Sequence, residues 1–260
     1  MRKEEYDAMF ELEERLWWYQ GMRAITGAIL DRTLRERGDV RLLDVGCGTG
    51  YSAVWLRDRF KLPEVVGVDL FPEAAAFWHR RGLDTAAISS VRQLPFTEGE
   101  FGIVTCFDVI YQLSSEDAEA AVAEMTRVLA PGGVLLIREP AYDWLRGGHD
   151  VAVATRHRYR LSELRRMLRS TGLVTKRTTY ANCLLFGLAV GHRLLSKLRG
   201  DEASDVKAVA GPLNRALASV LKIEASLHRY TVFPFGLSVI ILAEKGRPGH
   251  PGATGAPSAR

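Results

Sequence analysis

The chain has 260 residues, of which 47% are apolar and 25% are charged, and its formal net charge is +4. These values are typical of a globular protein with a full core, and no apolar run approaches the ~20 residues needed to span a bilayer. Three widely spaced cysteines fit neither a disulfide framework nor a zinc site, and the charged start of the chain lacks the apolar core of a secretory signal. We therefore expect a cytoplasmic protein, in which contact with a membrane surface stays an alternative.

Positive charge is concentrated in one part of the chain. Twelve lysines or arginines and two acids lie between Arg146 and Arg199, whereas residues 1–20 hold six acids and three bases. Such a basic segment is typical of proteins that meet an anionic substrate, a membrane surface or nucleic acid. An ordinary solvated face explains it equally well.

Strand-like and helix-like segments alternate along the chain, which predicts a doubly wound, Rossmann-like α/β sheet of about seven strands. Two amphipathic helices are expected first, near residues 4–19 and 22–36. Apolar runs then predict strands near 40–45, 64–69, 84–88, 101–107 and 133–138. A helix near 161–170 and strands at 173–180 and 237–244 follow. We expect a mostly parallel sheet with an antiparallel last strand.

Residues 184–233 form an insertion where a minimal sheet would need only a short loop. Leu184–Leu198 and Pro212–Arg229 are predicted helices, and the second carries one apolar face. Its apolar residues are Leu213, Leu217, Val220, Leu221 and Leu227. We interpret the insertion as a lid over a substrate, with a membrane contact or a dimer interface as alternatives. Residues 1–38 are then an N-terminal helical cap, 39–246 the main domain and 247–260 a disordered tail rich in glycine and proline.

A strand followed by three glycines is the most informative pattern. Gly46, Gly48 and Gly50 are separated by single residues, and glycine lets the backbone turn sharply and approach a ligand. A dinucleotide fold would place its glycines as G-x-G-x-x-G, which differs from this spacing. The next strand ends at Asp69, whose carboxylate can accept both ribose hydroxyls of an adenosine. The alternative is a surface aspartate that caps the helix starting near Pro72.

Five segments together resemble class I S-adenosylmethionine (SAM)-dependent methyltransferases of the ubiquinone/menaquinone-methylase-like, type 11 group. They are Asp44–Gly50, Gly67–Asp69, Leu94–Phe96, Phe101–Val104 and Arg127–Gly133, in the family's order. The resemblance covers residues 40–140. Weaker likeness to a bacterial subgroup extends to Trp17–Tyr19 with Arg23, to His149–Asp150 and to Arg158–Arg160.

The resemblance implies SAM as the cofactor and S-adenosylhomocysteine as its product. The implied cofactor-binding residues are Asp44, Gly46, Cys47, Gly48, Gly50, Asp69, Leu70, Ser90, Val91 and Phe107. Among them, Asp44 would orient the glycine loop and the ligand's amino group, Asp69 would hold the ribose, and Leu70 would lie against the adenine. Phe107 would lie beside the methionine end.

Three positions depart from the family pattern. Ser90 replaces an acid that often accepts a hydrogen bond from the adenine amino group, which predicts an altered affinity. Gly102 replaces the usual aspartate at the start of the fourth strand. Tyr111-Gln112 stands where many relatives have Glu-His, so a histidine base at that place is absent.

The acceptor side is less constrained, because methyl transfer mainly needs positioning and needs a base only when the nucleophile holds a proton. His149 is the candidate base, since histidine titrates near neutral pH, and a structural histidine is the alternative. The other candidates on this side are Trp18, Tyr19, Arg23, Tyr111, Glu139, Tyr142, His157 and Tyr159. No metal is expected.

The leading hypothesis is a methyltransferase that acts on a small-molecule or lipid-like, anionic acceptor. A non-catalytic SAM-fold binding or scaffold protein is the alternative, and a nicotinamide oxidoreductase is disfavoured by the glycine spacing. Nucleic acid is disfavoured as a partner because no recognisable module would read or stack bases. The oligomeric state stays open.

Overall fold

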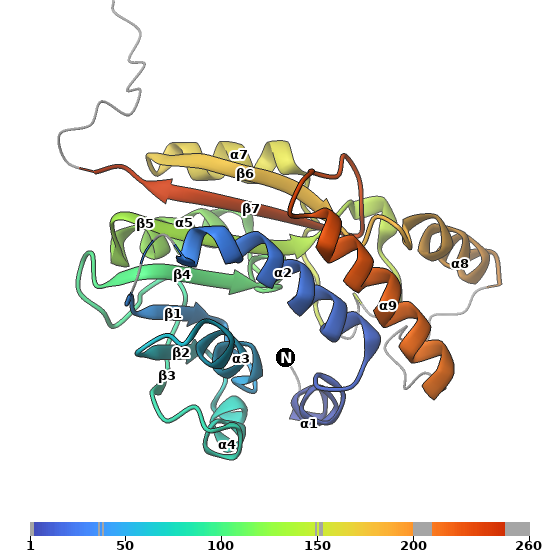
Figure 1. Cartoon of the computed structure of the whole chain (residues 1–260), viewed down its shortest axis with the longest axis horizontal. Helices are drawn as coiled ribbons and strands as arrows, with labels where there is room; N and C mark the ends of the chain where they lie inside the picture. The colour runs from blue at the N-terminus through green and yellow to red at the C-terminus, as the bar shows by residue number, and fades with distance from the viewer. Residues whose placement is uncertain are drawn as a thin grey trace, which may run out of the picture.

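The structure is a computed structural model that describes residues 3–35, 37, 39–148, 150, 153–199 and 210–247. A seven-stranded sheet in the order β3-β2-β1-β4-β5-β7-β6 forms its centre (Figure 1). The strands are β1 (Leu42–Val45), β2 (Val65–Asp69), β3 (Ala86–Ile88), β4 (Phe101–Phe107), β5 (Leu129–Pro140), β6 (Leu173–Ala181) and β7 (Ser238–Lys245). Strand β7 runs antiparallel to both of its neighbours, β5 and β6, and the pairs among β1 to β5 are parallel, so the predicted fold class is confirmed.

Helices cover both faces of the sheet, as Figure 1 shows. They are α1 (Lys3–Leu12), α2 (Trp17–Arg35), α3 (Tyr51–Phe60), α4 (Pro72–Arg81), α5 (Ser115–Val128), α7 (Leu161–Ser170), α8 (Phe186–Arg199) and α9 (Gly211–Leu227), with the short 3-10 turns η1 (Ile110–Gln112) and η2 (Asp143–Leu145). Helices α5 and α7 share one hydrophobic core with the sheet, and α2, α3, α4 and α9 share the other.

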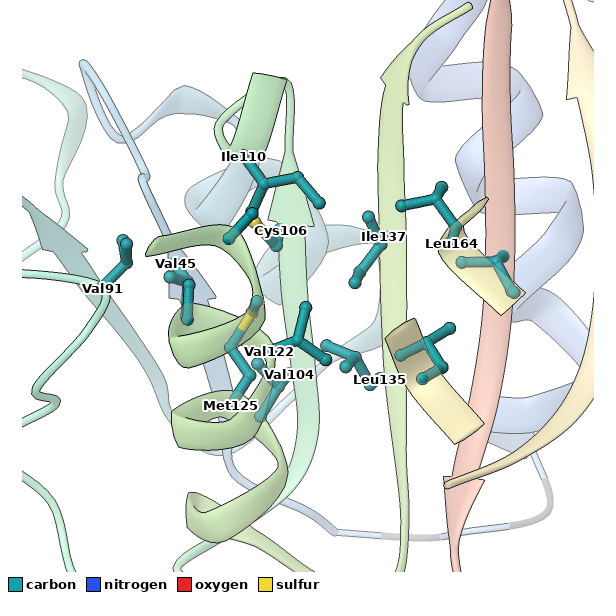
Figure 2. Close-up of a cluster of buried hydrophobic side chains, with 14 of the residues drawn as sticks. Val45, Val91, Val104, Cys106, Ile110, Val122, Met125, Leu135, Ile137 and Leu164 are labelled. Atoms are coloured by element: carbon teal, nitrogen blue, oxygen red, sulfur yellow. The ribbon is translucent and has the colours of Figure 1, made fainter. Parts of the chain in front are cut away.

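The central strands are mainly apolar because both of their faces are covered, and their polar residues lie toward their carboxyl ends. All four residues of β1 are buried. Figure 2 shows one of the two cores, in which alternate residues of β4 and β5 meet the apolar faces of α5 and α7. The residues labelled there on these elements are Val104, Cys106, Leu135, Ile137, Val122, Met125 and Leu164.

The break between the two N-terminal helices lies earlier in the chain than predicted. It was expected between residues 19 and 22, and the structure corrects this position. Helix α1 ends at Leu12, and α2 begins at Trp17. The side chain of Asn214 in α9 explains the difference, because its Oδ1 accepts the N–H of Trp17 at 2.8 Å and its Nδ2 donates to the carbonyl of Arg15 at 2.8 Å. A cap from a distant residue therefore places Trp17, Trp18 and Tyr19 in the first turn of α2.

The predicted helical insertion lies between β6 and β7. The last residue of β6, Ala181, pairs with the first residue of β7, Ser238, so the chain leaves and re-enters the sheet at adjacent points. In between, α9 lies along α2, as Figure 1 shows. No helix within the described ranges is long and apolar enough to cross a membrane. The predicted tail beyond Arg247 lies outside the described residues, and so does His149.

The strand order reverses at β1, which has β2 on one side and β4 on the other. In open α/β sheets, ligands bind outside the carboxyl ends of the strands at such a point. The glycine loop follows β1 directly, Asp69 ends β2 and Phe107 ends β4. The topology therefore gathers the principal predicted cofactor residues at one edge of the sheet.

Candidate active site

The glycine loop requires glycine for two separate reasons. Gly46, Gly48 and Gly50 have φ angles of 74°, 54° and 87°, which lie in the left-handed region that favours glycine. In addition, a Cβ atom on Gly46 would overlap the side chain of Val109, and one on Gly48 would lie 2.8 Å from Cε of Met9. Neighbours from the loop after β4 and from α1 thus approach the bare backbone of the glycine loop.

Asp69 is buried beside this loop and accepts three hydrogen bonds. The amide of Gly48 donates to its Oδ2 at 2.9 Å, while the amide of Phe71 and the hydroxyl of Tyr6 donate to its Oδ1 at 3.1 and 2.9 Å. Asp69 is only 7% exposed. It does accept the amide at the start of α4, but the bond to Gly48 and its burial exclude a purely surface capping role.

The turn between α1 and α2 is hydrogen-bonded to the glycine loop. Buried Glu13 accepts the hydroxyl of Thr49 and pairs with Arg81 at 2.8 Å. Burial raises the pKa of Glu13, and these donors oppose the shift. Arg81 also donates to the carbonyl of Phe10 at 2.5 Å. These contacts fasten α1 over the glycine loop, which no local sequence pattern indicates.

Asp44 lies behind the loop, at the inner end of the site. The hydroxyl of Thr105 in β4 donates to its Oδ1 at 2.6 Å. Burial raises the pKa of Asp44 to about 6, and the positive charge of Arg138 acts in the opposite direction. Asp44 therefore links β1 to β4 directly beneath the turn at Gly46.

A buried ion pair that sequence reasoning missed completes this edge. Arg138 in β5 is 7% exposed, and its Nε donates to Oδ2 of Asp108 at 3.1 Å. The guanidinium lies 4.7 Å from the ring centre of Phe107 and 5.5 Å from that of Trp18, which are cation–π distances. The one available signal was an arginine that directly follows the apolar run of β5.

Two further predicted acceptor-side residues lie beside this ion pair. Tyr19 packs edge-on against Trp18 at 5.0 Å, and Asp108 and Arg138 both act on its pKa, which burial raises. Arg23 donates to the carbonyl of Glu13 at 2.5 Å and lies 4.6 Å from the ring centre of Tyr51. Burial lowers the pKa of Arg23, and the charge of Arg138 adds to that effect.

Comparison with known proteins agrees with this geometry. Residues 43–137 match the type 11 family described as a methyltransferase domain. Demethylmenaquinone methyltransferase from Thermus thermophilus is 38% identical over 109 residues, which cover 40% of this chain and 49% of that protein. Malonyl-[acyl-carrier protein] O-methyltransferase from Serratia marcescens is 35% identical over 97 residues, covering 37% and 36%.

The matched region contains the glycine loop, Asp69 and β4. It is a class I SAM-dependent methyltransferase domain. The chain spans about half or less of the length of these curated relatives. The solved structure of geranyl diphosphate C-methyltransferase from Streptomyces coelicolor A3(2) shares the fold, with a TM-score of 0.54 at 17% identity over 82% of this chain and 77% of that one.

Three of the residues predicted on the acceptor side are buried in the core of the methyltransferase domain, where they have structural contacts. Glu139 is fully buried and accepts the amides of Val109, Ile110 and Tyr111 at 3.1, 3.0 and 3.1 Å. Burial raises the pKa of Glu139 well above its usual value. Tyr111 is buried, and the hydroxyl of Tyr159 donates to the carbonyl of Ile110 at 3.4 Å. Together they hold η1 in place next to the site.

The segment after β5 holds the remaining acceptor candidates. His157 contacts Asp143 through Nδ1 at 2.9 Å and Glu163 through Nε2 at 3.2 Å. It lines a shallow surface pocket whose lining residues include none from the glycine loop. Tyr142 stacks on Tyr180 at 5.3 Å. His149, the predicted base, lies outside the described residues, and its neighbour Asp150 forms a buried ion pair with Arg158 at 2.7 Å.

The predicted adenine side of the site is more open. Leu70 is 52% exposed, Val91 is buried, and Oγ of Ser90 accepts the amide of Arg92 at 3.3 Å. Gly102 has a physical explanation, because a Cβ atom there would lie 2.8 Å from Cβ of Val40. Among the described residues, no group of three or more His, Cys, Asp or Glu side chains is arranged to hold a metal ion.

Proposed function

We propose that this protein transfers a methyl group from SAM to a small-molecule or lipid-like acceptor that carries an anionic group. One observation supports this proposal above all. At the switch point of the sheet, the glycine loop and Asp69 adjoin a cluster of aromatic rings and two arginines, Arg23 and Arg138.

The cofactor half of the site fits SAM. Oδ1 of Asp69 already accepts a hydroxyl group, that of Tyr6, so a ribose hydroxyl has a compatible acceptor there. Gly46 and Gly48 offer the close backbone approach, and Leu70 offers an exposed apolar side chain for the adenine. SAM would supply the electrophilic methyl group of its sulfonium, and the protein would hold and orient both reactants in line.

The acceptor half combines flat apolar surfaces with positive charge. Trp18, Tyr19 and Phe107 supply the rings, and the cations are Arg138, which is paired with Asp108, and Arg23, which donates to the carbonyl of Glu13. Arginine is suited to carboxylate and phosphate groups, so an acceptor with such a group is expected. The relative named for malonyl-[acyl-carrier protein] has a carboxylate on its named substrate and fits this class, whereas demethylmenaquinone fits only its lipid-like part.

The need for a base depends on the acceptor. A carboxylate nucleophile carries no proton to remove, whereas a phenol or an amine does. His149 remains our candidate base for a protonated nucleophile. In that case His149→Ala lowers the methylation rate without changing SAM affinity, and the pH profile loses an ionisation near neutrality. An unchanged rate would assign His149 a structural role.

Calorimetry tests the cofactor, and isotope transfer tests the reaction. We expect SAM and S-adenosylhomocysteine to bind and NAD not to bind. Methyl-labelled SAM incubated with extracts should label an acidic or lipid-soluble product. Arg138→Gln should raise the KM of that acceptor by about tenfold or more and leave SAM affinity unchanged, since a charged hydrogen bond contributes ~1.5–3 kcal/mol.

The matched control is Arg127→Gln, which also removes an arginine paired with an acid but at a distance from the sheet's carboxyl edge. It should leave the KM unchanged. SAM binding without transfer to any acceptor would favour the non-catalytic alternative, and NAD binding would overturn the proposal.

A further inference from the structure

Helix α9 has two apolar faces rather than the single one predicted. Ala218, Leu221 and Ala225 are buried, and Leu221 packs so closely on α2 that a Cβ atom on Gly21 would overlap it. Leu213 and Leu227, which the sequence placed on the same face as Leu221, point to solvent. The contact with α2 therefore uses only part of the apolar surface of the helix.

The outward residues form a continuous row, which we name the α9 stripe. It consists of Leu213, Ala216, Val220, Ile223 and Leu227, spaced three or four residues apart as on one side of a helix. Leu213, Ile223 and Leu227 are 54%, 58% and 42% exposed. Single exposed leucines are ordinary, but a row along a whole helix marks an interaction surface.

Helix α8 carries further exposed leucines. The amide of Leu184, just before α8, donates to Oε2 of Glu224 at 2.9 Å, which ties the start of α8 to the C-terminal part of α9. Leu184, Leu188 and Leu195 are 47%, 67% and 45% exposed. Figure 1 shows α8 and α9 at the end of the molecule toward which β4 and β5 point. We call the α9 stripe together with these three leucines the α8–α9 face. This face therefore adjoins the edge that holds the candidate site.

The exposed charges of α8 and α9 are positive. Helix α8 contains no acid, and the single acid of α9, Glu224, is fully buried. Arg215 and Lys222 of α9 lie seven residues apart and are both exposed, and at 3.6 residues per turn they flank the α9 stripe rather than lying within it. Over residues 186–227, including the link between the helices, six lysines or arginines stand against four acids.

We propose that the α8–α9 face docks the protein onto an anionic lipid bilayer. Exposed leucines with adjoining cations are the chemistry that an anionic membrane surface binds. A second copy of the chain is less suitable, because a twofold contact would place the same face against itself, with no exposed carboxylate on α8 or α9 to pair the cations. Asn214 connects α9 to Trp17, so the N-terminal end of the docking helix lies next to the start of α2, which carries the aromatic residues of the predicted acceptor side.

Vesicle sedimentation of the full chain tests the proposal. The protein should pellet with vesicles of equal parts phosphatidylglycerol and phosphatidylcholine, less so as salt rises, and should stay in solution with phosphatidylcholine alone. Arg215→Glu with Lys222→Glu should lower the partition coefficient by at least about 30-fold, since each cation near the surface contributes about fivefold. Leu213→Ser with Ile223→Ser should also abolish pelleting.

Matched controls use exposed residues elsewhere. Arg166→Glu on α7 reverses an exposed cation, and Ile88→Ser on β3 removes an apolar side chain that is 46% exposed. Both should pellet as the parent does. Three results would each overturn the proposal. The α9 variants could bind vesicles as well as the parent does, or Arg166→Glu could lose vesicle binding. The protein could also prove to be a dimer that does not bind vesicles and that Leu213→Ser with Ile223→Ser converts to a monomer. The measurement needs neither cofactor nor acceptor, so its failure is independent of the proposed activity.

Discussion

The hydroxyl of Tyr6 lies 2.9 Å from Oδ1 of Asp69, although the two residues are 63 positions apart in the chain. Tyr6 is 1% exposed, and burial raises the pKa of its hydroxyl, which therefore remains a donor. In the proposed site, the ribose of a bound cofactor would hydrogen-bond the same carboxylate. Helix α1 and the cofactor would then compete for Asp69, and we predict that binding requires Tyr6 to withdraw.

Removal of this hydroxyl should make cofactor binding tighter. In Tyr6→Phe, the closed form loses a hydrogen bond that SAM must otherwise displace, so the Kd for SAM should fall about three- to tenfold, the equivalent of ~0.5–1.5 kcal/mol. Calorimetry measures the change. Tyr159→Phe, which removes a buried hydroxyl bonded to Ile110 instead, should leave the Kd unchanged. Weaker binding in Tyr6→Phe would show that Tyr6 holds the cofactor rather than competing with it.

A comparison of Gly48 with Gly82 separates the effect of backbone strain from that of the close approach of other atoms to the glycine loop. Gly48 and Gly82 both have positive φ, 54° and 71°, but a Cβ atom on Gly82 would meet nothing within 4 Å. Both alanine variants should lose roughly 1 kcal/mol of stability from strain. Only Gly48→Ala should weaken SAM binding, by at least about tenfold. Similar SAM affinities in the two variants, measured by calorimetry, would refute the assignment of the loop.

The raised pKa of Asp44 predicts a pH dependence with a definite sign. Because its pKa rises from 3.8 to about 6 on folding, the folded state favours the protonated form, so Asp44 costs stability as pH rises through this range. Asp44→Asn keeps an acceptor for Thr105 and has no charge to bury. Relative to the parent, it should gain ~2–3 kcal/mol between about pH 4 and pH 7 in urea unfolding.

Asp117 is the control for this measurement. A hydrogen bond from Ser114 lowers its pKa, so its contribution to stability is present above its unfolded pKa and lost as pH falls. Asp117→Asn should therefore shift stability with pH in the opposite direction. A pH-independent difference between Asp44→Asn and the parent would contradict the burial of a charge at Asp44.

The cap between α9 and α2 makes a separate prediction. Asn214→Ala removes the acceptor for the amide of Trp17 and should cost about 1 kcal/mol in the free energy of unfolding. Ser226→Ala on the same helix removes only a hydroxyl bonded to the carbonyl of Lys222 within α9, and should cost little. Equal losses in the two variants would mean that Asn214 does not stabilise the start of α2.

Local patterns explain what could be predicted from the sequence. The strands β6 and β7 were predicted to within a residue of their bounds, since Gly172 directly precedes β6 and an apolar run forms most of β7. The glycine loop and Asp69 are recognisable for the same reason, since their spacing is a local property. Strand β5 begins earlier than predicted, at Leu129, because Leu129 pairs with Phe101 across the sheet.

Contacts between distant residues explain what could not be predicted. Nothing around Tyr6 indicates a partner 63 residues away, and the start of α2 depends on Asn214, nearly 200 positions later. The ion pair of Asp108 with Arg138 could not be predicted, because it depends on the pairing of β4 with β5 in the sheet. The division of α9 into two apolar faces likewise depends on which residues α2 covers.

The pairing of Ala181 with Ser238 has an evolutionary consequence. A segment whose two ends are already adjacent can change length at a small cost, since loop-closure entropy grows only with the logarithm of length, about 0.6 kcal/mol for each doubling. The segment between Ala181 and Ser238, residues 182–237, can therefore change in length without altering the order of the strands, provided that α9 keeps its contacts with α2. Selection can then vary the outward side of the insertion while the packing of Leu221 and the cap from Asn214 stay fixed.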